Sequence, residues 1–187
     1  MGTQAKVYSK IIVDDLQLPV TPEEFLKLCD EEYPKCFAKC SFLPGVERVL
    51  DHFDEHKIPM AIASSSKIDS YHQKTEKYGQ KFQKYWHHIL LASDDPEVKV
   101  SKPAPDTFFV CRDRFDPKPV SAKCLVFEDS TAGVVSGCRA GMQVVWIPDP
   151  RIDVKECMDK DPELRPTQVL KSMEDFKPQD FGLPPLP

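Results

Sequence analysis

Three short segments of the sequence carry side chains suited to phosphate and metal chemistry: Ala63-Ser64-Ser65-Ser66, Ser101-Lys102-Pro103-Ala104-Pro105-Asp106 and Glu128-Asp129-Ser130-Thr131-Ala132-Gly133. A serine hydroxyl, together with backbone N–H groups at the start of a helix, can hold a phosphate oxygen. Adjacent carboxylates supply the oxygen ligands that a hard cation such as Mg²⁺ prefers. The segments therefore predict that Ser64 binds phosphate and that Glu128 and Asp129 hold a magnesium ion.

Each of these residues also has an ordinary structural interpretation. Ser64 could simply cap a helix, and adjacent acids such as Glu128 and Asp129 often do the same. A single lysine such as Lys102 is most often a solvated surface charge. The case for a site therefore depends on the three segments meeting in space.

Short apolar runs alternate with helical patterns between residues 44 and 148, which is typical of a parallel sheet with crossover helices. Strands are predicted at residues 58–63, 88–92, 124–127 and 143–147, and helices at 45–56, 67–79, 103–115 and 131–140. Ser64 and Asp129 then follow strands, and Lys102 precedes a helix. All three are expected at the carboxyl edge of the sheet, where open α/β folds bind ligands.

The two ends of the chain have different patterns. Residues 1–42 are predicted to form helices, one of which starts at a capping box made by Thr21, Pro22 and Glu24. The C-terminal stretch is rich in proline, which argues against long regular elements there. Residues 168–176 are its one piece predicted to be ordered.

Composition and charge limit the classes of partner. The 187 residues suffice for one α/β domain with a small appendage, and the net charge of -5 indicates neither a nucleic acid nor an anionic membrane as partner. The sequence has no secretory leader and no apolar run of about 18 residues, so a cytoplasmic location is predicted. Its seven cysteines include no Cys-x-x-Cys pair, which favours reduced thiols over disulfides or a zinc site.

Taken together, the three polar segments resemble the second, third and fourth motifs of the haloacid dehalogenase-like phosphatases. The resemblance covers about residues 5–187 and implies an α/β fold, with a Rossmann-like parallel sheet core and a partial helical cap. It implies that Lys102 neutralises charge beside the phosphate, that Ser64 and Ser65 bind phosphate oxygens, and that Mg²⁺ is the cofactor. Lys102 and Ser64 would be the catalytic residues, and the substrate would be a small phosphorylated metabolite.

Two further stretches are similar to one branch of that family: Asp94-Asp95-Pro96-Glu97-Val98 and Asp175-Phe176-Lys177-Pro178-Gln179-Asp180-Phe181-Gly182-Leu183-Pro184. This branch acts on pseudouridine 5′-phosphate and similar nucleotide or sugar phosphates. The resemblance implies an aspartyl-phosphate intermediate and Mg²⁺. It divides the chain into a helical cap remnant (1–42), a Rossmann-like core (43–150) and a C-terminal segment packing on the core (151–187).

One element implied by the resemblance is missing from the sequence. The first motif of the family is an apolar strand ending in Asp-x-Asp-Gly-Thr, and its first Asp is the nucleophile. The nearest substitute is the run that ends at Asp14 and Asp15, where Leu16 and Gln17 replace the second Asp and the Gly. Asp14 also lies too near Ser64 in the sequence for a full cap between them, and the run aligns with a cap helix instead.

In the family the missing strand is central in the sheet, so we predict a sheet without its central first strand. Its neighbours would carry unpaired backbone groups, each costing about 1–3 kcal/mol if buried and unsatisfied. The chain is therefore expected to be a truncated or alternatively started product. Two functions stay open: a Mg²⁺-dependent phosphatase, and a catalytically silent protein that binds phosphate or regulates.

Overall fold

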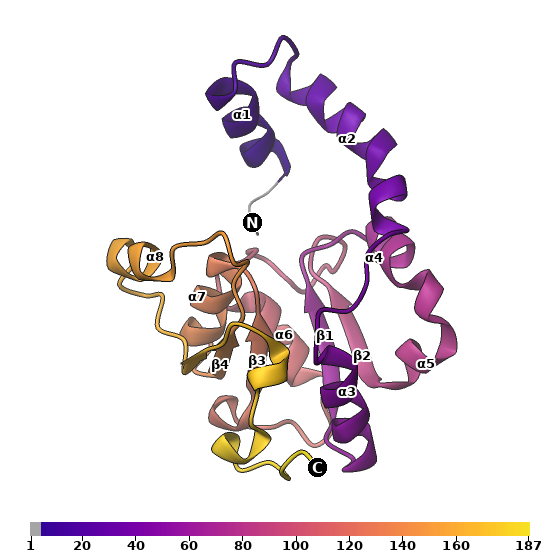
Figure 1. Ribbon diagram of the computed structural model, residues 1–187, viewed down its shortest axis with the longest axis vertical. Helices are drawn as coiled ribbons and strands as arrows, with labels where there is room; N and C mark the ends of the chain where they lie inside the picture. The colour runs from indigo at the N-terminus through magenta and orange to yellow at the C-terminus, as the bar shows by residue number, and fades with distance from the viewer. Residues whose placement is uncertain (1–4) are drawn as a thin grey trace.

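The computed structural model describes residues 5–187, so the part of the predicted cap remnant at residues 1–4 lies outside it. The strands are β1 (Met60–Ser64), β2 (Trp86–Leu91), β3 (Leu125–Glu128), β4 (Gln143–Trp146) and β5 (Gln168–Val169) (Figure 1). The helices are α1 (Ala5–Asp15), α2 (Pro22–Phe37), α3 (Val46–Glu55), α4 (Ile68–Thr75), α5 (Gly79–Lys84), α6 (Asp106–Asp113), α7 (Thr131–Arg139) and α8 (Val154–Lys160).

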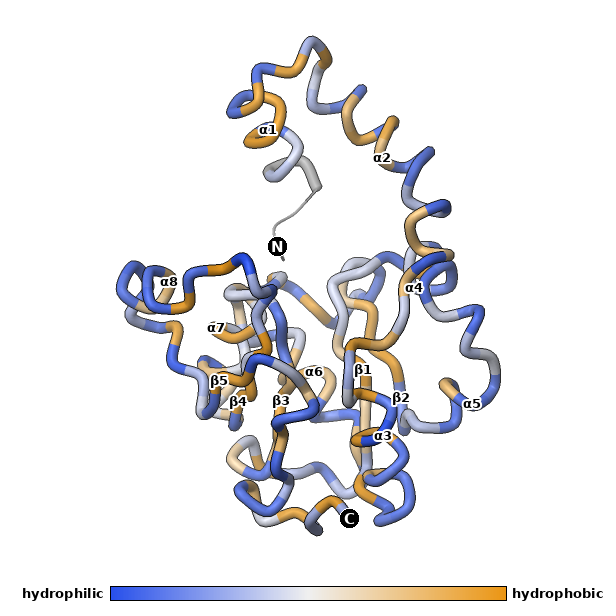
Figure 2. The backbone as a smooth tube through the Cα atoms, viewed as in Figure 1, coloured by the Kyte–Doolittle hydropathy of each residue, from blue (hydrophilic) through white to orange (hydrophobic). Residues whose placement is uncertain are grey.

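The predicted α/β fold with parallel strands is confirmed. β1 pairs with β2, β3 with β4, and β4 with β5, all in parallel. The strands are rich in apolar residues, as expected of strands covered on both faces (Figure 2). Each of the four strands predicted from the sequence is present, with ends that differ by at most two residues.

The sheet is divided into two pieces, β1-β2 and β3-β4-β5. Across the division β1 and β3 are the nearest strands, so each has an edge facing the other piece (Figure 1). The carbonyls of Ser64 and Glu128 bond to residues that follow β2 and β4. Because successive residues of a strand direct their backbone groups to opposite sides, those of Ala63 and Phe127 face the division. The predicted absence of a central strand is therefore seen as a break in the sheet.

Side chains alternate between the two faces of the larger piece. Val126, Val144 and Trp146 pack with α6 and α7 in one buried cluster, which also receives Ala63 of β1. Phe127 and Val145 point the other way, into a cluster with α3 and the end of the chain. This period of two is expected for strands between two covering layers.

Residues 170–187, which we call the C-terminal strap, cross the second face and contact both pieces of the sheet. Phe176 lies 4.9 Å from the ring of Phe127 and 6.3 Å from that of Phe53 on α3, measured between centroids. The side chain of Met60 in β1 packs against the same cluster. Gly45 permits close approach of the strap, because a Cβ there would lie 2.5 Å from the backbone nitrogen of Glu174.

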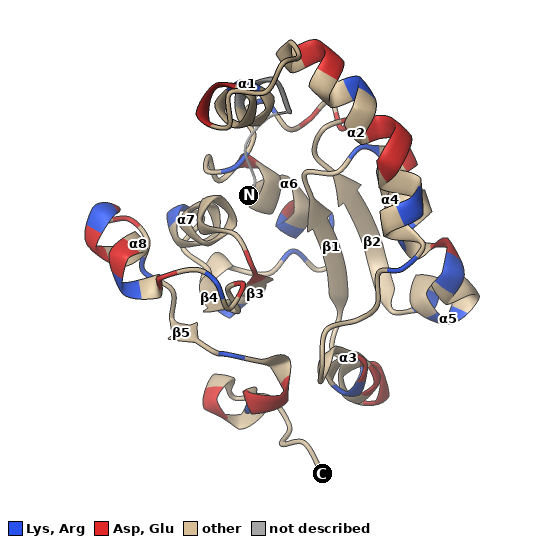
Figure 3. Ribbon diagram, turned by 45° about the horizontal axis from the view of Figure 1, so that its top comes forward, with Lys and Arg blue, Asp and Glu red and all other residues tan. Residues whose placement is uncertain are grey.

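The N-terminal helices form a hairpin in which α1 packs on α2 (Figure 1). The predicted capping box is confirmed: Thr21 N donates to Glu24 Oε2 (2.8 Å), and Glu24 N donates to Thr21 Oγ1 (3.2 Å). No residue of α2 is buried, and Leu16 and Leu28 are more than half exposed. Acidic and basic segments follow one another along α2 (Figure 3). The role of this hairpin as a substrate cap stays a prediction.

Two predicted helices differ from the structure, and one observed helix was not predicted. The helix predicted at 103–115 begins at Asp106, because Pro105 disfavours a helical conformation at Ala104. The helix predicted at 67–79 is α4 followed by a 3₁₀ turn at Glu76–Tyr78. The proline-rich end of the chain contains the unpredicted helix α8, which starts where the Asp153 side chain accepts from the backbone N–H of Glu156 at 2.9 Å.

Candidate functional site

Ser64 ends β1 at the carboxyl edge of the sheet. Its Oγ accepts a hydrogen bond from the backbone N–H of Ser66 at 3.1 Å. Helix α4 begins only at Ile68, whose backbone N–H donates to Oδ2 of Asp94 at 2.7 Å and not to Ser64. The alternative that Ser64 caps this helix is therefore wrong, and the hydroxyl instead shapes a turn whose backbone lies at the sheet edge. Ser65 follows in the same turn and is exposed.

Lys102 reaches across the break in the sheet. Its Nζ donates to the carbonyl oxygen of Ala63 in β1 at 3.1 Å and to the carboxylate of Glu128 at the end of β3. The ammonium also lies 4.5 Å from the centroid of the Phe108 ring. Since only 6% of its side chain is exposed, Lys102 is a buried, paired cation and not a solvated surface charge.

Glu128 is held against the start of α7. Only 8% of its side chain is exposed, and a Cβ at Gly133 would lie 2.1 Å from its carboxylate. Ser130 caps α7 by accepting from the backbone N–H of Gly133 at 3.1 Å. The absence of a side chain at Gly133 therefore makes the space in which the Glu128 carboxylate meets Lys102.

Asp129 is arranged differently from its neighbour. The residue is exposed, and its backbone carbonyl accepts from Trp146 Nε1 at 3.0 Å, which fixes the backbone under the side chain. An exposed carboxylate at a sheet edge suits Mg²⁺, which commonly takes one or two protein carboxylates and keeps several waters. Glu128 does not fit that role in this arrangement, because its carboxylate is bonded to Lys102. No cluster of three His, Cys, Asp or Glu side chains suited to a metal occurs within residues 5–187.

The structure brings four of the predicted site residues to one edge, namely Ser64, Lys102, Glu128 and Asp129. Direct contact links Lys102 to Glu128, while Ser64 adjoins the residue whose carbonyl Lys102 binds. Asp14 is not among them: it lies on α1, where its carboxylate pairs with Lys10 at 2.7 Å. Because Asp14 lies on a helix and not at the end of a strand of the sheet, the structure does not support it as the nucleophile.

One cation at this edge was missed in the sequence analysis. Lys74 on α4 donates from Nζ to Ser66 Oγ at 3.2 Å, within the turn that follows Ser64. The contact spans eight residues and joins a helix to a loop, so no short motif signals it. The amphipathic spacing of α4 identifies its buried face but not that its lysine side chain turns back toward the end of β1.

A second group of titratable side chains lies beneath β2, away from this edge. Cys111 Sγ is 3.4 Å from Nε2 of His88, whose ring also contacts the carbonyl of Cys111 at 2.9 Å. Burial raises the pKa of Cys111 to about 11, and burial lowers the pKa of His88. A thiol with a raised pKa is a poor nucleophile, so this pair is part of the packing of α6 on the sheet.

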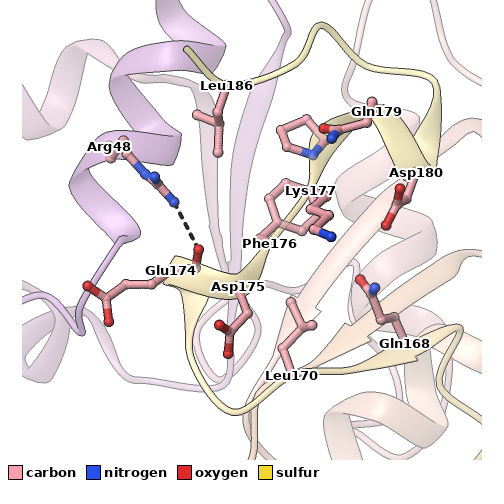
Figure 4. A pocket seen from close by; sticks show the side chains of 11 residues that line it. Arg48, Gln168, Leu170, Glu174, Asp175, Phe176, Lys177, Gln179, Asp180 and Leu186 are labelled. Atoms are coloured by element: carbon pink, nitrogen blue, oxygen red, sulfur yellow. Dashed lines mark hydrogen bonds between the residues drawn. The ribbon is translucent and has the colours of Figure 1, made fainter.

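A pocket of about 560 Å³ lies along the C-terminal strap (Figure 4). Arg48 points across it and donates to the carbonyl of Glu174 at 3.0 Å. The lining combines polar side chains, such as Gln168, Lys177 and Asp180, with apolar side chains of the strap. None of the site residues at the sheet edge lines this pocket, so it is separate from them.

These features define a class of protein: a parallel α/β fold with a lysine, two acids and a turn of residues 64–66, which we call the serine turn, at its carboxyl edge. The sequence matches the haloacid dehalogenase-like hydrolase family over residues 1–147. This chain therefore belongs to that family. Within residues 5–187, no helix has the length and apolar character needed to cross a bilayer.

Two curated relatives are phosphatases by name. One is called a probable pseudouridine-5′-phosphatase of Drosophila melanogaster and is 38% identical over 98% of this chain and 77% of its own length. The other, (DL)-glycerol-3-phosphatase 2 of Arabidopsis thaliana, is 37% identical over 99% of this chain and 75% of its own. The relatives extend beyond the part that this chain matches.

A solved structure has the same fold. A haloacid dehalogenase family hydrolase from Deinococcus radiodurans R1, determined with bound phosphate and sodium, superposes with a TM-score of 0.74 at 20% identity. The match covers 99% of this chain and 80% of that one. At this identity the likeness supports the fold and not the substrate.

Proposed function

We propose that this chain provides the phosphate-binding and metal-binding side of a Mg²⁺-dependent phosphatase of small phosphorylated metabolites. The observation that carries the proposal is the position of Lys102, which joins the ends of β1 and β3 through Ala63 and Glu128. A buried ammonium at a sheet edge, beside a turn of backbone N–H groups, can neutralise a phosphate during transfer. Nucleotide and sugar phosphates such as pseudouridine 5′-phosphate are the substrates that we propose.

The roles of the residues follow from their surroundings. The turn of Ser64 and Ser65 would bind phosphate oxygens, and Lys102 would lie on the other side of the phosphate. Glu128 would orient Lys102, since their contact fixes the ammonium. Asp129 would hold Mg²⁺, which when bound would polarise the phosphoryl group.

Within residues 5–187, no carboxylate other than that of Glu128 contacts Lys102 to serve as a nucleophile. In the described part of the chain, its ammonium contacts the Ala63 carbonyl, the Glu128 carboxylate and the Phe108 ring. Strand edges of β1 and β3 face the break beside them. We propose that activity requires an additional strand at this position, with a carboxylate at its end.

A catalytically silent phosphate-binding protein is the second candidate. The pairing of Lys102 with Glu128 favours it, because both charges are already satisfied without a substrate. The two candidates share phosphate binding and differ in whether a phosphate ester is hydrolysed.

The test is release of phosphate from p-nitrophenyl phosphate, with and without Mg²⁺, by the purified chain alone and with a peptide carrying an apolar strand ending in Asp-x-Asp-Gly-Thr. We expect turnover only with the peptide, and its loss in Lys102→Met and Asp129→Asn. Turnover by the chain alone that Asp14→Asn abolishes would assign the nucleophile to Asp14. Phosphate binding without turnover in any mixture would favour the silent candidate.

A further inference from the structure

Lys74 is a cation at the sheet edge to which the proposed function gives no role. It lies near the end of α4, and its Nζ donates to Ser66 Oγ at 3.2 Å. The same ammonium lies 4.7 Å from the centroid of the Phe37 ring, in the last turn of α2. Lys74 is therefore placed where the serine turn, α4 and the helical hairpin meet.

The charge of Lys74 has no anionic partner within the described part of the chain. Its ammonium contacts a hydroxyl and an aromatic ring, although the residue is half-buried. Lys81, on α5, contrasts with it, because its ammonium pairs with both Glu47 and Asp51 at 3.2 Å. A partly desolvated cation without a counterion attracts an anion more strongly than a paired one.

The position of Lys74 relative to Lys102 indicates which anion its charge would bind. Residues 63–66 form one continuous segment, in which the end of β1 leads into the serine turn, and Lys102 bonds to the carbonyl of Ala63 at one end of it. At the other end Lys74 bonds to Ser66, whose backbone N–H donates to Ser64 Oγ at 3.1 Å. The two ammonium groups thus attach to opposite ends of this segment, which contains the residues that we assign to phosphate.

We propose that Lys74 is a further phosphate-binding residue, which contacts the phosphate group of the substrate from the side of the helical hairpin. A phosphate dianion has more oxygen acceptors than Lys102 alone can satisfy, and a second ammonium supplies additional donors. Ser66 positions the Lys74 side chain, while the Phe37 ring restricts it from the hairpin side. The inference rests on the proposed function in requiring phosphate at Ser64, but it does not require hydrolysis.

Binding of inorganic phosphate, measured by calorimetry on the intact chain, tests the inference. We expect Lys74→Met to weaken binding about tenfold or more, as for the loss of one charge-assisted hydrogen bond. Lys74→Arg keeps the charge and is expected to retain most of the affinity. Lys102→Met provides the reference for the site itself.

Lys77→Met is the matched control. Lys77 also connects the core to the end of α2, through a hydrogen bond from Nζ to the carbonyl of Ala38 at 3.3 Å. Unlike Lys74, it does not bond to the serine turn within the described residues. We expect phosphate affinity within about twofold of the parent. Melting temperatures of all variants establish that any loss of binding is not a loss of folding.

The outcomes separate this inference from the proposed function. Equal phosphate affinities of Lys74→Met and Lys77→Met would overturn the inference. Lys74 would then only connect the core to the helical hairpin. Weaker binding in Lys74→Met, together with no hydrolysis in any mixture, would support the inference and would exclude the proposed phosphatase activity. Absence of phosphate binding by the parent chain at millimolar concentration would overturn both.

Discussion

The two pieces of the sheet differ in the burial of their strands. No residue of β1 is buried, whereas Val144, Val145 and Trp146 of β4 are 0% exposed. Both segments are largely apolar, but β4 has a strand on each side and β1 has only β2. The comparison of these two strands teaches that apolar sequence alone does not determine how deeply a strand is buried, since the one with a neighbour on each side is the more buried. We expect the β1-β2 piece to be the less stable of the two.

The largest expected effect concerns the strap that connects the pieces. Phe176→Ala should destabilise the chain by about 4 kcal/mol, because this buried ring packs against both Phe53 and Phe127. Denaturant unfolding should show the loss, and the two pieces should then unfold in separate transitions. Val120→Ala, at a residue that is 66% exposed, is the control with little expected change. A single transition of unchanged midpoint in Phe176→Ala would show that the strap does not join the pieces.

On the other face of the sheet, the two pieces are joined by Lys102, which bonds to Ala63 of β1 and to Glu128 of β3. Lys102→Met should cost about 3 kcal/mol, because it leaves the carboxylate of Glu128 buried without its partner. Adding Glu128→Gln to this variant should restore part of the stability, since no buried charge then remains. Urea titrations of the three proteins measure this, and equal stability of the single and double variants would contradict it.

A change confined to the larger piece should have an intermediate effect. Alanine normally stabilises a helix relative to glycine by up to about 1 kcal/mol. We expect the opposite for Gly133→Ala, a loss of about 2 kcal/mol, because the new methyl group meets the Glu128 carboxylate. Thermal unfolding gives the sign directly. Shortening the facing side chain in Gly133→Ala with Glu128→Asp should recover part of the loss, and a stabilised Gly133→Ala would refute the clash.

Truncations in the two pieces measure the difference between them. Val144→Ala removes two carbons from a fully buried site and should cost about 2 kcal/mol. Ile62→Ala in β1 removes three carbons from a half-buried site and should cost about 1 kcal/mol, less despite the larger truncation. A greater loss from Ile62→Ala would reverse the comparison.

The smallest effect is a pH dependence in the region that follows β2. A hydrogen bond from Arg114 holds the pKa of Asp95 below its usual value, with the two side chains 2.8 Å apart. The stabilisation is therefore fully present above the ordinary aspartate pKa of about 4 and is lost as the pH falls below it. We expect Asp95→Asn to reduce the fall in stability between about pH 5 and 2 by less than 1 kcal/mol. An unchanged pH profile would mean that this pair contributes nothing.

The core strands and the residues of the sheet edge could be predicted from sequence because their signals are local. The apolar run that ends in Ser64 and the strand before Glu128 each lie within a few residues of the side chain that they position. The capping box at Thr21 is equally local. Such features need only the spacing of neighbouring residues, and the structure confirms them.

Contacts between distant segments could not be predicted in this way. The pairing of Lys102 with Glu128 and the contact of Lys74 with Ser66 depend on how the elements pack. Proline content correctly indicated few long elements near the C-terminus. It did not reveal that the strap would bury Phe176, because a chain without regular hydrogen bonding can still fill a core.

The distribution of the two tryptophans has a practical consequence. Trp86 lies in β2 and Trp146 in β4, so each piece of the sheet contains one indole. Replacing either tryptophan with phenylalanine leaves a single tryptophan, and the tryptophan fluorescence then reports on one piece of the sheet at a time. Because Trp146 Nε1 donates to the carbonyl of Asp129, its emission also reports on the backbone beneath the proposed magnesium ligand. The chain thus contains its own optical probes for the order in which its halves open.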